Sequence, residues 1–202
     1  MTKRSARTDE IAELMIHIGR SARGEDAGAA LTAAQWTGLR FFARANSASR
    51  TPSAFASFQA TTRGTASQTV KSLESKGLLA RRRSEHDGRS VVFEITEDGR
   101  AMLCEDPLRH LMAALDRLPP EACETLSLSL AQVAADLAAL RGCRAFGTCD
   151  GCSHYAADGG SKGGYCACVA ADLAPEEIGR LCANFDQRHD TLPVPPLKTR
   201  RS

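Results

Sequence analysis

Cysteines are the residues of this chain whose type and spacing suggest chemistry most directly. Five of the eight cysteines lie in the stretch FGTCDGCSHYAADGGSKGGYCACVAADLAPEEIGRLCANF, residues 146–185. Cys149 and Cys152 form a C-x-x-C pair around Asp150-Gly151, and two thiolates at this spacing can bind one metal ion from a tight turn. A closed tetrahedral site needs two further ligands, and the available thiols are Cys166, Cys168 and Cys182.

The expected ligand set is Cys149, Cys152, Cys166 and Cys182. Cys166 and Cys168 are separated by one residue and cannot easily both reach one tetrahedral ion, so Cys168 is a reserve ligand, together with His154 and Cys143. The motif CDGCSHY, followed by two later cysteines, is similar to small four-cysteine appendages of the form C-x-x-C-x-H-[FY]. Zinc is our first choice, because it would hold together a glycine-rich segment too small to fold alone. An iron-sulfur cluster and unliganded redox thiols remain alternatives.

The compartment bears on this interpretation, because cysteines form disulfides mainly outside the cytoplasm. The N-terminal residues contain no unbroken apolar stretch of signal-peptide length, since Glu13, His17 and Arg20 interrupt the apolar positions. We also expect no later run to approach the ~18 apolar residues that cross a bilayer. The sequence therefore predicts a cytoplasmic protein without membrane association, whose clustered thiols are metal ligands or redox groups. Cys104 and Cys123 are expected to be small buried apolar residues.

Charge is unevenly distributed along the chain. The formal net charge is only +2, but the segment from Arg63 to Arg89 contains seven basic residues against three acidic ones. A local basic surface on a nearly neutral molecule is typical of nucleic-acid binding.

The segments before and within this basic region predict four helices followed by a hairpin. Apolar spacing predicts helices over about 8–23 and from 33, the second capped by Thr32. Thr51 and Pro52 begin a short third helix, and a fourth over about 62–76 ends at Gly77. Two strands, 78–83 and 90–96, follow with a polar turn between them. This order is that of a mainly α protein with a small β-hairpin wing, a winged helix-turn-helix.

The second half predicts dimerisation helices and the cysteine-rich appendage. A long helix after Thr96 is expected to bend at Pro107. A last helix after Pro119-Pro120 has apolar residues at alternating intervals of four and three, either a coiled-coil-like seam or a face packed on its own domain. The resulting division is 1–142 for the DNA-binding and dimerisation domain, 143–190 for the cysteine-rich segment, and 191–202 for a disordered tail rich in proline and charge.

The hairpin region resembles the MarR family of bacterial transcriptional regulators. The matching residues are Leu73-Glu74, Gly77-Leu78, Arg81, Asp87, Arg89, Ile95-Thr96, Gly99 and the LTAAQW stretch at 31–36. The similarity covers about residues 8–140. It implies a homodimer whose first and last helices interlock and which places one recognition helix and one wing per subunit on double-stranded DNA. It also implies that Arg89 reaches the minor groove from the wing, and it leaves room for a small-molecule effector.

The candidate DNA contacts follow from the exposed face of the fourth helix, because one helix fits into the major groove. Arg63 and Gln68 could make bidentate contacts with bases, whereas Thr65, Ser67 and Lys71 suit phosphates. Arg81 and Arg82 belong to a run of three arginines on a strand, whose side chains alternate and cannot all reach the same phosphate. Asp87 is expected to orient the wing. Two-fold symmetry predicts a pseudo-palindromic operator with half-sites ~10 base pairs apart, and the expected role is repression.

Two other function classes remain open. Cys149 and Cys152 could exchange thiols and disulfides as a redox enzyme, although no β-α-β pattern surrounds them. Alternatively, the winged helix could dock a protein instead of DNA. The sequence contains no hydrolase elbow, phosphate-binding glycine loop or paired-carboxylate constellation, so we expect a protein that is not an enzyme.

Overall fold

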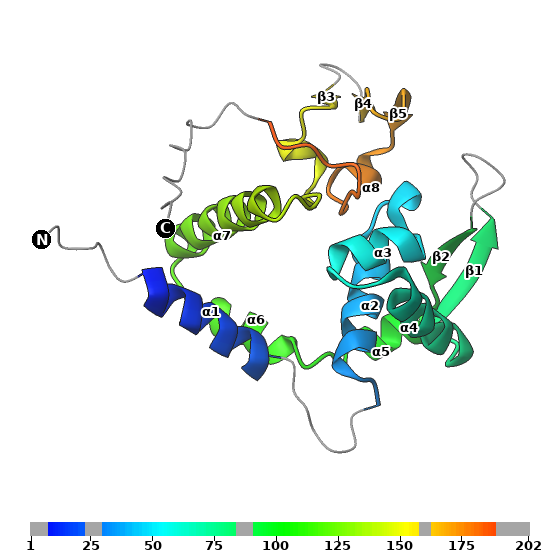
Figure 1. Ribbon diagram of the computed structural model, residues 1–202, viewed down its shortest axis with the longest axis horizontal. Coiled ribbons are helices and arrows are strands. Elements are labelled where there is room, and N and C mark those ends of the chain that lie inside the picture. Colours follow the sequence, from blue (N-terminus) through cyan, green and yellow to red (C-terminus); the bar gives the residue numbers. More distant parts are fainter. Residues whose placement is uncertain (1–7, 23–29, 84–90, 158–162, 189–202) are drawn as a thin grey trace, which may run out of the picture.

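The computed structural model describes residues 8–22, 30–83, 91–157 and 163–188. The tip of the predicted wing, with Asp87 and Arg89, and the predicted tail lie outside the described residues. The chain forms a helical lobe with a β-hairpin and a small cysteine-containing unit (Figure 1). Three further helices, α1 (Thr8–Ser21), α6 (Arg109–Leu115) and α7 (Pro120–Leu140), form an arm outside the lobe.

The helical lobe is built from helices with capped starts, and the caps at Thr32 and Thr51 are those that the sequence predicts. α2 (Ala33–Arg44) begins with a reciprocal capping box between Thr32 and Gln35. η1 (Ser47–Ser49) leads into α3 (Pro52–Phe58), which Thr51 caps, and Thr62 caps α4 (Arg63–Ser75). The helices bury a common core that also includes residues of the hairpin: Trp36, Leu39, Phe41, Phe42, Phe55, Ala66, Val70, Leu73, Leu79 and Phe93.

A helix-turn-helix and a hairpin result from this packing. The turn between α3 and α4 contains Ala60 at φ 50°, and the main-chain NH of Thr61 donates to Ala56. Gly77, at φ 73°, ends α4 in the left-handed conformation that favours glycine. β1 (Leu79–Arg83) then pairs antiparallel with β2 (Val91–Ile95). The expected mainly α fold with a β-hairpin wing, a winged helix-turn-helix, is confirmed.

The helix expected after Thr96 is broken, not merely bent. It consists of α5 (Glu97–Leu103) and α6 (Arg109–Leu115), which are separated by five residues. Pro107 has no NH to continue the helical ladder, and the carboxylate of Asp106 instead accepts from the NH of Leu108 at 2.8 Å. Asp106 also pairs with Arg40 of α2, so the break is held against the helical lobe.

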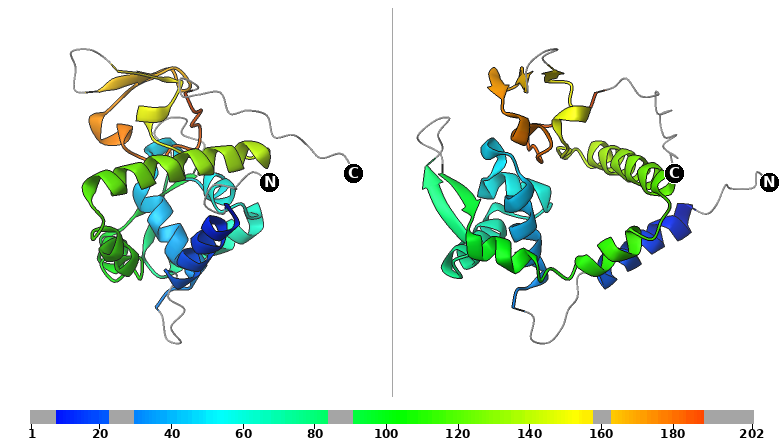
Figure 2. Two further views of the ribbon diagram at one scale, coloured as in Figure 1. Left: turned by 90° about the vertical axis from the view of Figure 1, so that its left-hand side faces the viewer. Right: turned by 180° about the vertical axis from the view of Figure 1, so that it is seen from behind.

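Helices α1 (Thr8–Ser21) and α7 (Pro120–Leu140) bury no residue in the single chain. α7 returns from α6 toward the cysteine-containing unit (Figures 1 and 2). Among the described residues, α7 alone is long and apolar enough to span a membrane by length and composition, which we did not expect. Core helices of soluble proteins have the same length and composition.

The cysteine module, which we define as residues 143–188, contains β3 (Tyr155–Ala157), β4 (Gly164–Cys166) and β5 (Ala171–Leu173) in one antiparallel sheet of order β3-β4-β5. A turn, η2 (Cys149–Gly151), precedes the sheet, and α8 (Pro175–Ile178) follows it. The module lies beside the end of α2 and the start of α3 (Figure 1).

The prediction for Cys104 and Cys123 is wrong, since both side chains are exposed. Cys104 follows the last residue of α5, and Cys123 lies on α7, which has no covering element in the single chain. Apolar character alone could not bury them. Cys123 lies on a helix without buried residues, and Cys104 is exposed although the preceding Met102 and Leu103 pack against the core.

Candidate nucleic-acid interface and cysteine cluster

The face of α4 opposite the core presents most of the predicted DNA-contacting side chains. Ala66, Val70 and Leu73 recur at intervals of four and three residues and point inward. The remaining positions are therefore turned outward, with Ser67 half-buried and the others exposed: Arg63, Thr65, Gln68 and Lys71. The hydroxyls of Thr62 and Thr65 lie 2.9 Å apart at the start of the helix.

An open hollow of about 500 Å³ separates α4 from the start of α3 and from β2. Arg63 and Ser67 line it from α4, Val91 lines it from β2, and Thr51, Pro52 and Ser53 line it from the start of α3. Arg63 and Ser67 thus face the same space as the base of the hairpin. The structure brings recognition-helix candidates and wing together on one side of the lobe.

The three arginines of β1 are separated by strand alternation. Arg82 lies opposite Val92, and its Nε is 3.6 Å from Glu94 on the neighbouring strand. Arg81 lies opposite Phe93 and shares its side of the hairpin with Arg83. All three side chains are exposed, and within the part of the chain that the structure describes Arg82 is the one with an acidic partner.

The cysteine cluster starts from the η2 turn. Cys149 and Cys152 are 7% and 6% exposed, and the NH of Cys152 donates to the carbonyl oxygen of Cys149 at 3.0 Å. The chain returns at Cys182, which pairs with Gly147 through a main-chain bridge. The NH of Asn184 donates to the Cys182 sulfur at 3.3 Å. Such a donor stabilises negative charge on sulfur.

Five thiols interact electrostatically within this unit. Burial, followed by the neighbouring thiols of Cys182, Cys152 and Cys166, raises the pKa of Cys149 to about 11. Burial and then Cys166 and Cys182 raise the pKa of Cys168, which is exposed at the surface. The thiols that act on Cys149 are therefore the three with which we expected it to share a metal ion.

The donor set suits a thiolate-bound metal, although the side chains are not arranged as ligands. Among the described residues, no group of three or more His, Cys, Asp or Glu side chains is positioned to hold a metal ion. The cysteines there are all free thiols. The thiols of Cys149, Cys152, Cys166 and Cys182 therefore lie near one another without coordination geometry. Binding of one ion would require these side chains to change their rotamers.

The three reserve ligands line one open cavity, although the Cys168 thiol also interacts with Cys166, Cys182 and Cys152. His154, Cys168 and Cys143 line an open cavity of about 510 Å³ between the end of α7 and the segment 183–187. The carbonyl of His154 accepts from the NH of Ala167. Cys143 and Cys168 are exposed, so this cavity is separate from the buried pair Cys149 and Cys152.

Several supporting residues carried no recognisable sequence signal. The ring of Phe185 packs so closely on Gly147 that a Cβ there would lie 2.6 Å from it. Ser153 and Asp186 join the two ends of the module through a 2.6 Å side-chain hydrogen bond. Helix α8 spans only Pro175–Ile178, so Cys182 lies beyond its end.

Comparison with known proteins gives one match by sequence and several by structure. Residues 31–90, which form α2 to α4 and the first strand of the hairpin, match the MarR family. No curated protein matches the chain.

Three solved structures illustrate the structural similarity. The FabT–DNA complex of Streptococcus pneumoniae is 22% identical, with a TM-score of 0.47 over 65% of this chain and 92% of that one. The MepR–DNA complex of S. aureus is 17% identical, with a TM-score of 0.49 over 67% and 99%. The regulator BldR of Sulfolobus solfataricus is 26% identical, with a TM-score of 0.42 over 63% and 99%.

Proposed function

We propose that this protein is a DNA-binding transcriptional regulator of the MarR type, which binds a pseudo-palindromic operator as a homodimer and represses transcription by occluding a promoter. The observation that carries the proposal is the exposed face of α4, with Arg63, Gln68 and Lys71, beside the arginines of β1. The family match over residues 31–90 covers this same region.

The proposed DNA contacts fall into two groups, those with base edges and those with phosphates. Arg63 and Gln68 suit base edges in the major groove, because their side chains can form paired hydrogen bonds. Thr65, Ser67 and Lys71 suit phosphates and fix the register of the helix on the duplex. Arg81 projects from the hairpin without the acidic partner that Arg82 has, so we assign the stronger phosphate contact to Arg81. We keep Arg89 as the minor-groove contact of the wing and Asp87 as its orienting residue.

The DNA-binding proposal is tested with a duplex that the protein selects from a random-sequence library. Arg63→Ala should weaken binding to this duplex by about tenfold or more, as expected for loss of a bidentate base contact. Lys71→Ala should weaken binding to all duplexes and lower the slope of log Kd against log salt by about one. Arg109→Ala, an exposed arginine on α6, is the control and should leave both quantities unchanged. Salt-independent binding or no selected duplex would favour the protein-docking alternative.

The homodimer is supported by the apolar faces that the single chain leaves uncovered. Ile11, Leu14 and Ile18 on α1 are 53%, 56% and 44% exposed. Val133 and Leu137 on α7 are 46% and 51% exposed and belong to its regular apolar seam. A second copy of the chain would cover these faces and also supply the two-fold symmetry that a palindrome requires. Sedimentation of wild-type protein should give a dimer, and Leu137→Asp should give a monomer; a monomeric wild-type protein would contradict this proposal.

We further propose that Cys149, Cys152, Cys166 and Cys182 form a metal site, with zinc as the first choice and an iron-sulfur cluster as the second. The supporting observation is that Cys149 and Cys152 are the only buried residues in the described part of the module apart from Gly164, which has no side chain. A unit this small without an apolar core needs a metal or a covalent link to stay folded. Zinc would supply that link by joining four thiolates. Cys166 is preferred over Cys168 because it is among the thiols that act on Cys149.

The metal proposal is tested by metal analysis and visible absorption of protein purified without oxygen. One zinc per chain in a colourless protein, lost in Cys149→Ser, supports a structural zinc site. Absorption near ~400 nm with stoichiometric iron supports a cluster that could report oxidation. Cys143→Ser is the matched control, since Cys143 is exposed and lies outside the four. Metal-free protein from every preparation, or full metal retention in Cys149→Ser, would overturn the assignment.

The thiol-disulfide exchange alternative receives less support. A nucleophilic cysteine needs a lowered pKa to populate its thiolate. The pKa of Cys149 is instead raised to about 11 by burial and by its neighbouring thiols. The proposal therefore assigns the pair to ligation and gives the protein no enzymatic role. As a DNA-binding regulator it would act in the cytoplasm.

A further inference from the structure

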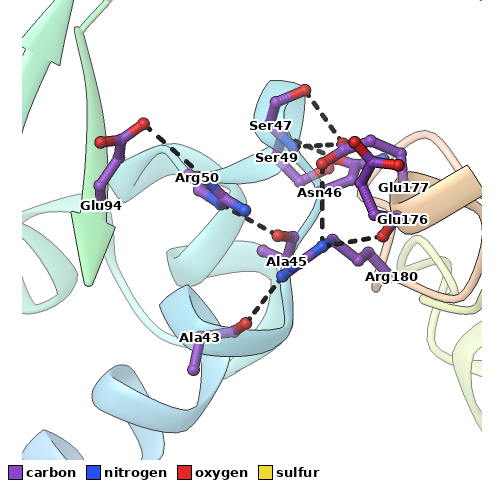
Figure 3. A network of polar contacts seen from close by, with 10 residues as sticks. All are labelled: Ala43, Ala45, Asn46, Ser47, Ser49, Arg50, Glu94, Glu176, Glu177 and Arg180. Carbon is purple, nitrogen blue, oxygen red and sulfur yellow. Dashed lines mark hydrogen bonds and ion pairs between the residues drawn. The ribbon is translucent and has the colours of Figure 1, made fainter. Parts of the chain in front are cut away.

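The cysteine module meets the helical lobe at the turn between α2 and α3. We call this contact, between residues 43–50 and residues 176–183, the joint (Figure 3). Its main-chain part is a short parallel bridge in which the NH of Asn46 donates to Leu181 and the NH of Leu181 donates to Arg44, both at 2.9 Å. The Leu181 side chain also packs against the core of the lobe.

Three side chains reinforce the bridge. One carboxylate oxygen of Glu177 accepts from both the NH and the hydroxyl of Ser47, at 2.8 and 3.0 Å. Arg180 donates from Nη1 to the carbonyl of Ala43 at 3.0 Å. The hydroxyl of Ser49, which is 2% exposed, accepts from the NH of Ala183 at 2.9 Å. Main-chain and side-chain groups of the module are thus held by one short turn of the lobe.

Cys182 lies in the middle of this attachment. Its preceding residue, Leu181, is bridged to the turn, and its following residue, Ala183, is bonded to Ser49. A movement of the Cys182 main chain must therefore either move the turn or break these bonds. Because Cys182 is also one of the four thiols of the proposed metal site, the state of that site bears directly on the turn.

The other side of the turn is connected to the wing. Arg50 donates from Nε to the carbonyl of Ala45 at 3.1 Å, and its Nη1 lies 3.9 Å from Glu94 of β2. The NH of Phe93 donates to the carbonyl of Arg50 at 2.8 Å. Burial and then the nearby Arg180 lower the pKa of Arg50, while Glu177 and Glu94 oppose this. Arg50 therefore interacts with charges of both the module and the wing.

The series of contacts from the module ends at Arg82, a candidate DNA contact. Glu94, which pairs with Arg50, also lies 3.6 Å from Arg82 of β1. Hydrogen bonds from the residues on either side of Cys182 therefore reach the turn, and the ion pairs of Glu94 with Arg50 and Arg82 extend from the turn to the wing. The outer links are between half-exposed groups and are individually weak, whereas the Phe93 bond ties the main chain of β2 to Arg50 directly.

We propose that the joint couples the four-cysteine site to the wing, so that metal loading of the module raises the affinity of the lobe for DNA. This inference rests on the proposed metal site and DNA-binding function. With a metal bound, the four cysteines fix the segment around Cys182, and the joint holds the α2–α3 turn and the wing in the arrangement described above. Without it, the module has little buried side-chain surface to hold its shape, so the segment can shift and release the turn.

The experiment compares operator affinity for zinc-loaded and chelator-treated protein, at fixed salt, with a duplex selected from a random library by the zinc-loaded form. Zinc content and the dimer state of each sample are measured alongside. Removal of zinc should weaken binding by about tenfold, within the range usual for coupling between two sites. Equal affinity in the two forms, with zinc stoichiometric in one and absent in the other, would overturn the inference. Absence of zinc from all samples would instead contradict the metal proposal, and absence of a selected duplex would contradict the DNA-binding proposal.

Variants of the joint separate coupling from metal binding. Glu177→Ala removes both bonds to Ser47 and should retain zinc while reducing the tenfold difference to about twofold or less. Glu176→Ala is the matched control, because Glu176 lies on the same helix, is exposed, and enters the joint through its carbonyl oxygen. It should retain the full difference. If Glu177→Ala does not fold, Glu177→Gln, which keeps an acceptor but removes the charge, should give an intermediate value. Full coupling in the folded joint variant would refute this role for the joint.

Discussion

Asp106 offers a test of how α6 and α7 are fixed to the helical lobe. Its carboxylate is 2.7 Å from Nη1 of Arg40 on α2 and accepts from the NH of Leu108 at 2.8 Å. The residue is 7% exposed, and the Arg40 side chain is 24% exposed. One carboxylate therefore ties α2 to the break between α5 and α6, which sets the direction in which the arm leaves the lobe.

The cost of Asp106→Ala follows from these contacts. Loss of a hydrogen bond to a charged group costs about 1.5–3 kcal/mol, and loss of the bond to the Leu108 NH costs about 1 kcal/mol. Arg40 would be left without this partner, but its partial exposure lets water solvate it, which limits the further cost. We expect the free energy of unfolding to fall by about 3 kcal/mol and Tm to fall by about 6–12 °C.

The measurement is urea unfolding and thermal unfolding at one protein concentration, because a dimer's stability depends on concentration. Asp106→Asn keeps an oxygen that can accept from Leu108 and should lose about half as much. Glu105→Gln is the control, since Glu105 forms only an exposed pair with Arg109 at 3.5 Å, and it should change stability by less than about 0.5 kcal/mol. A change of that small size in Asp106→Ala would refute the role assigned to this carboxylate.

Two glycines give further predictions. Gly147→Ala would bring its Cβ to 2.6 Å from the Phe185 ring, so it should disrupt the cysteine module and reduce metal content while circular dichroism shows the helical lobe intact. The control Gly179→Ala, with nothing within 4 Å of its Cβ, should retain the metal. Equal metal content in both variants would contradict this prediction. Gly99→Ala would press its Cβ against the carbonyl oxygen of Leu78, where backbone cannot move aside, and should lower the free energy of unfolding by about 3 kcal/mol in urea titration. A loss below about 1 kcal/mol would show that α5 can shift away from β1.

The winged helix could be predicted from sequence because its signals are local. Thr32, Thr51 and Thr62 each precede a helix at the capping position, and Gly77 stands where α4 needs a positive φ. These choices depend on residues within one helical turn and need no knowledge of the tertiary fold. The same reasoning failed after Thr96, where the apolar spacing continued through residues that the structure places in two helices. The difference came from Asp106, whose partner Arg40 is 66 positions away and could not be identified from spacing.

In the cysteine module, too, local signals could be recognised in the sequence and long-range contacts could not. The C-x-x-C spacing nominates Cys149 and Cys152 because two ligands and their turn occupy four consecutive residues. By contrast, Glu177 and Ser47 are separated by 130 positions, and neither residue type distinguishes a joint from an ordinary surface. Cys182 belongs to both, because its thiol is part of the proposed ligand pattern and its flanking residues form the joint. A variant at Cys182 would therefore disturb metal binding and attachment together, and only substitutions on the lobe side or on α8 can separate them.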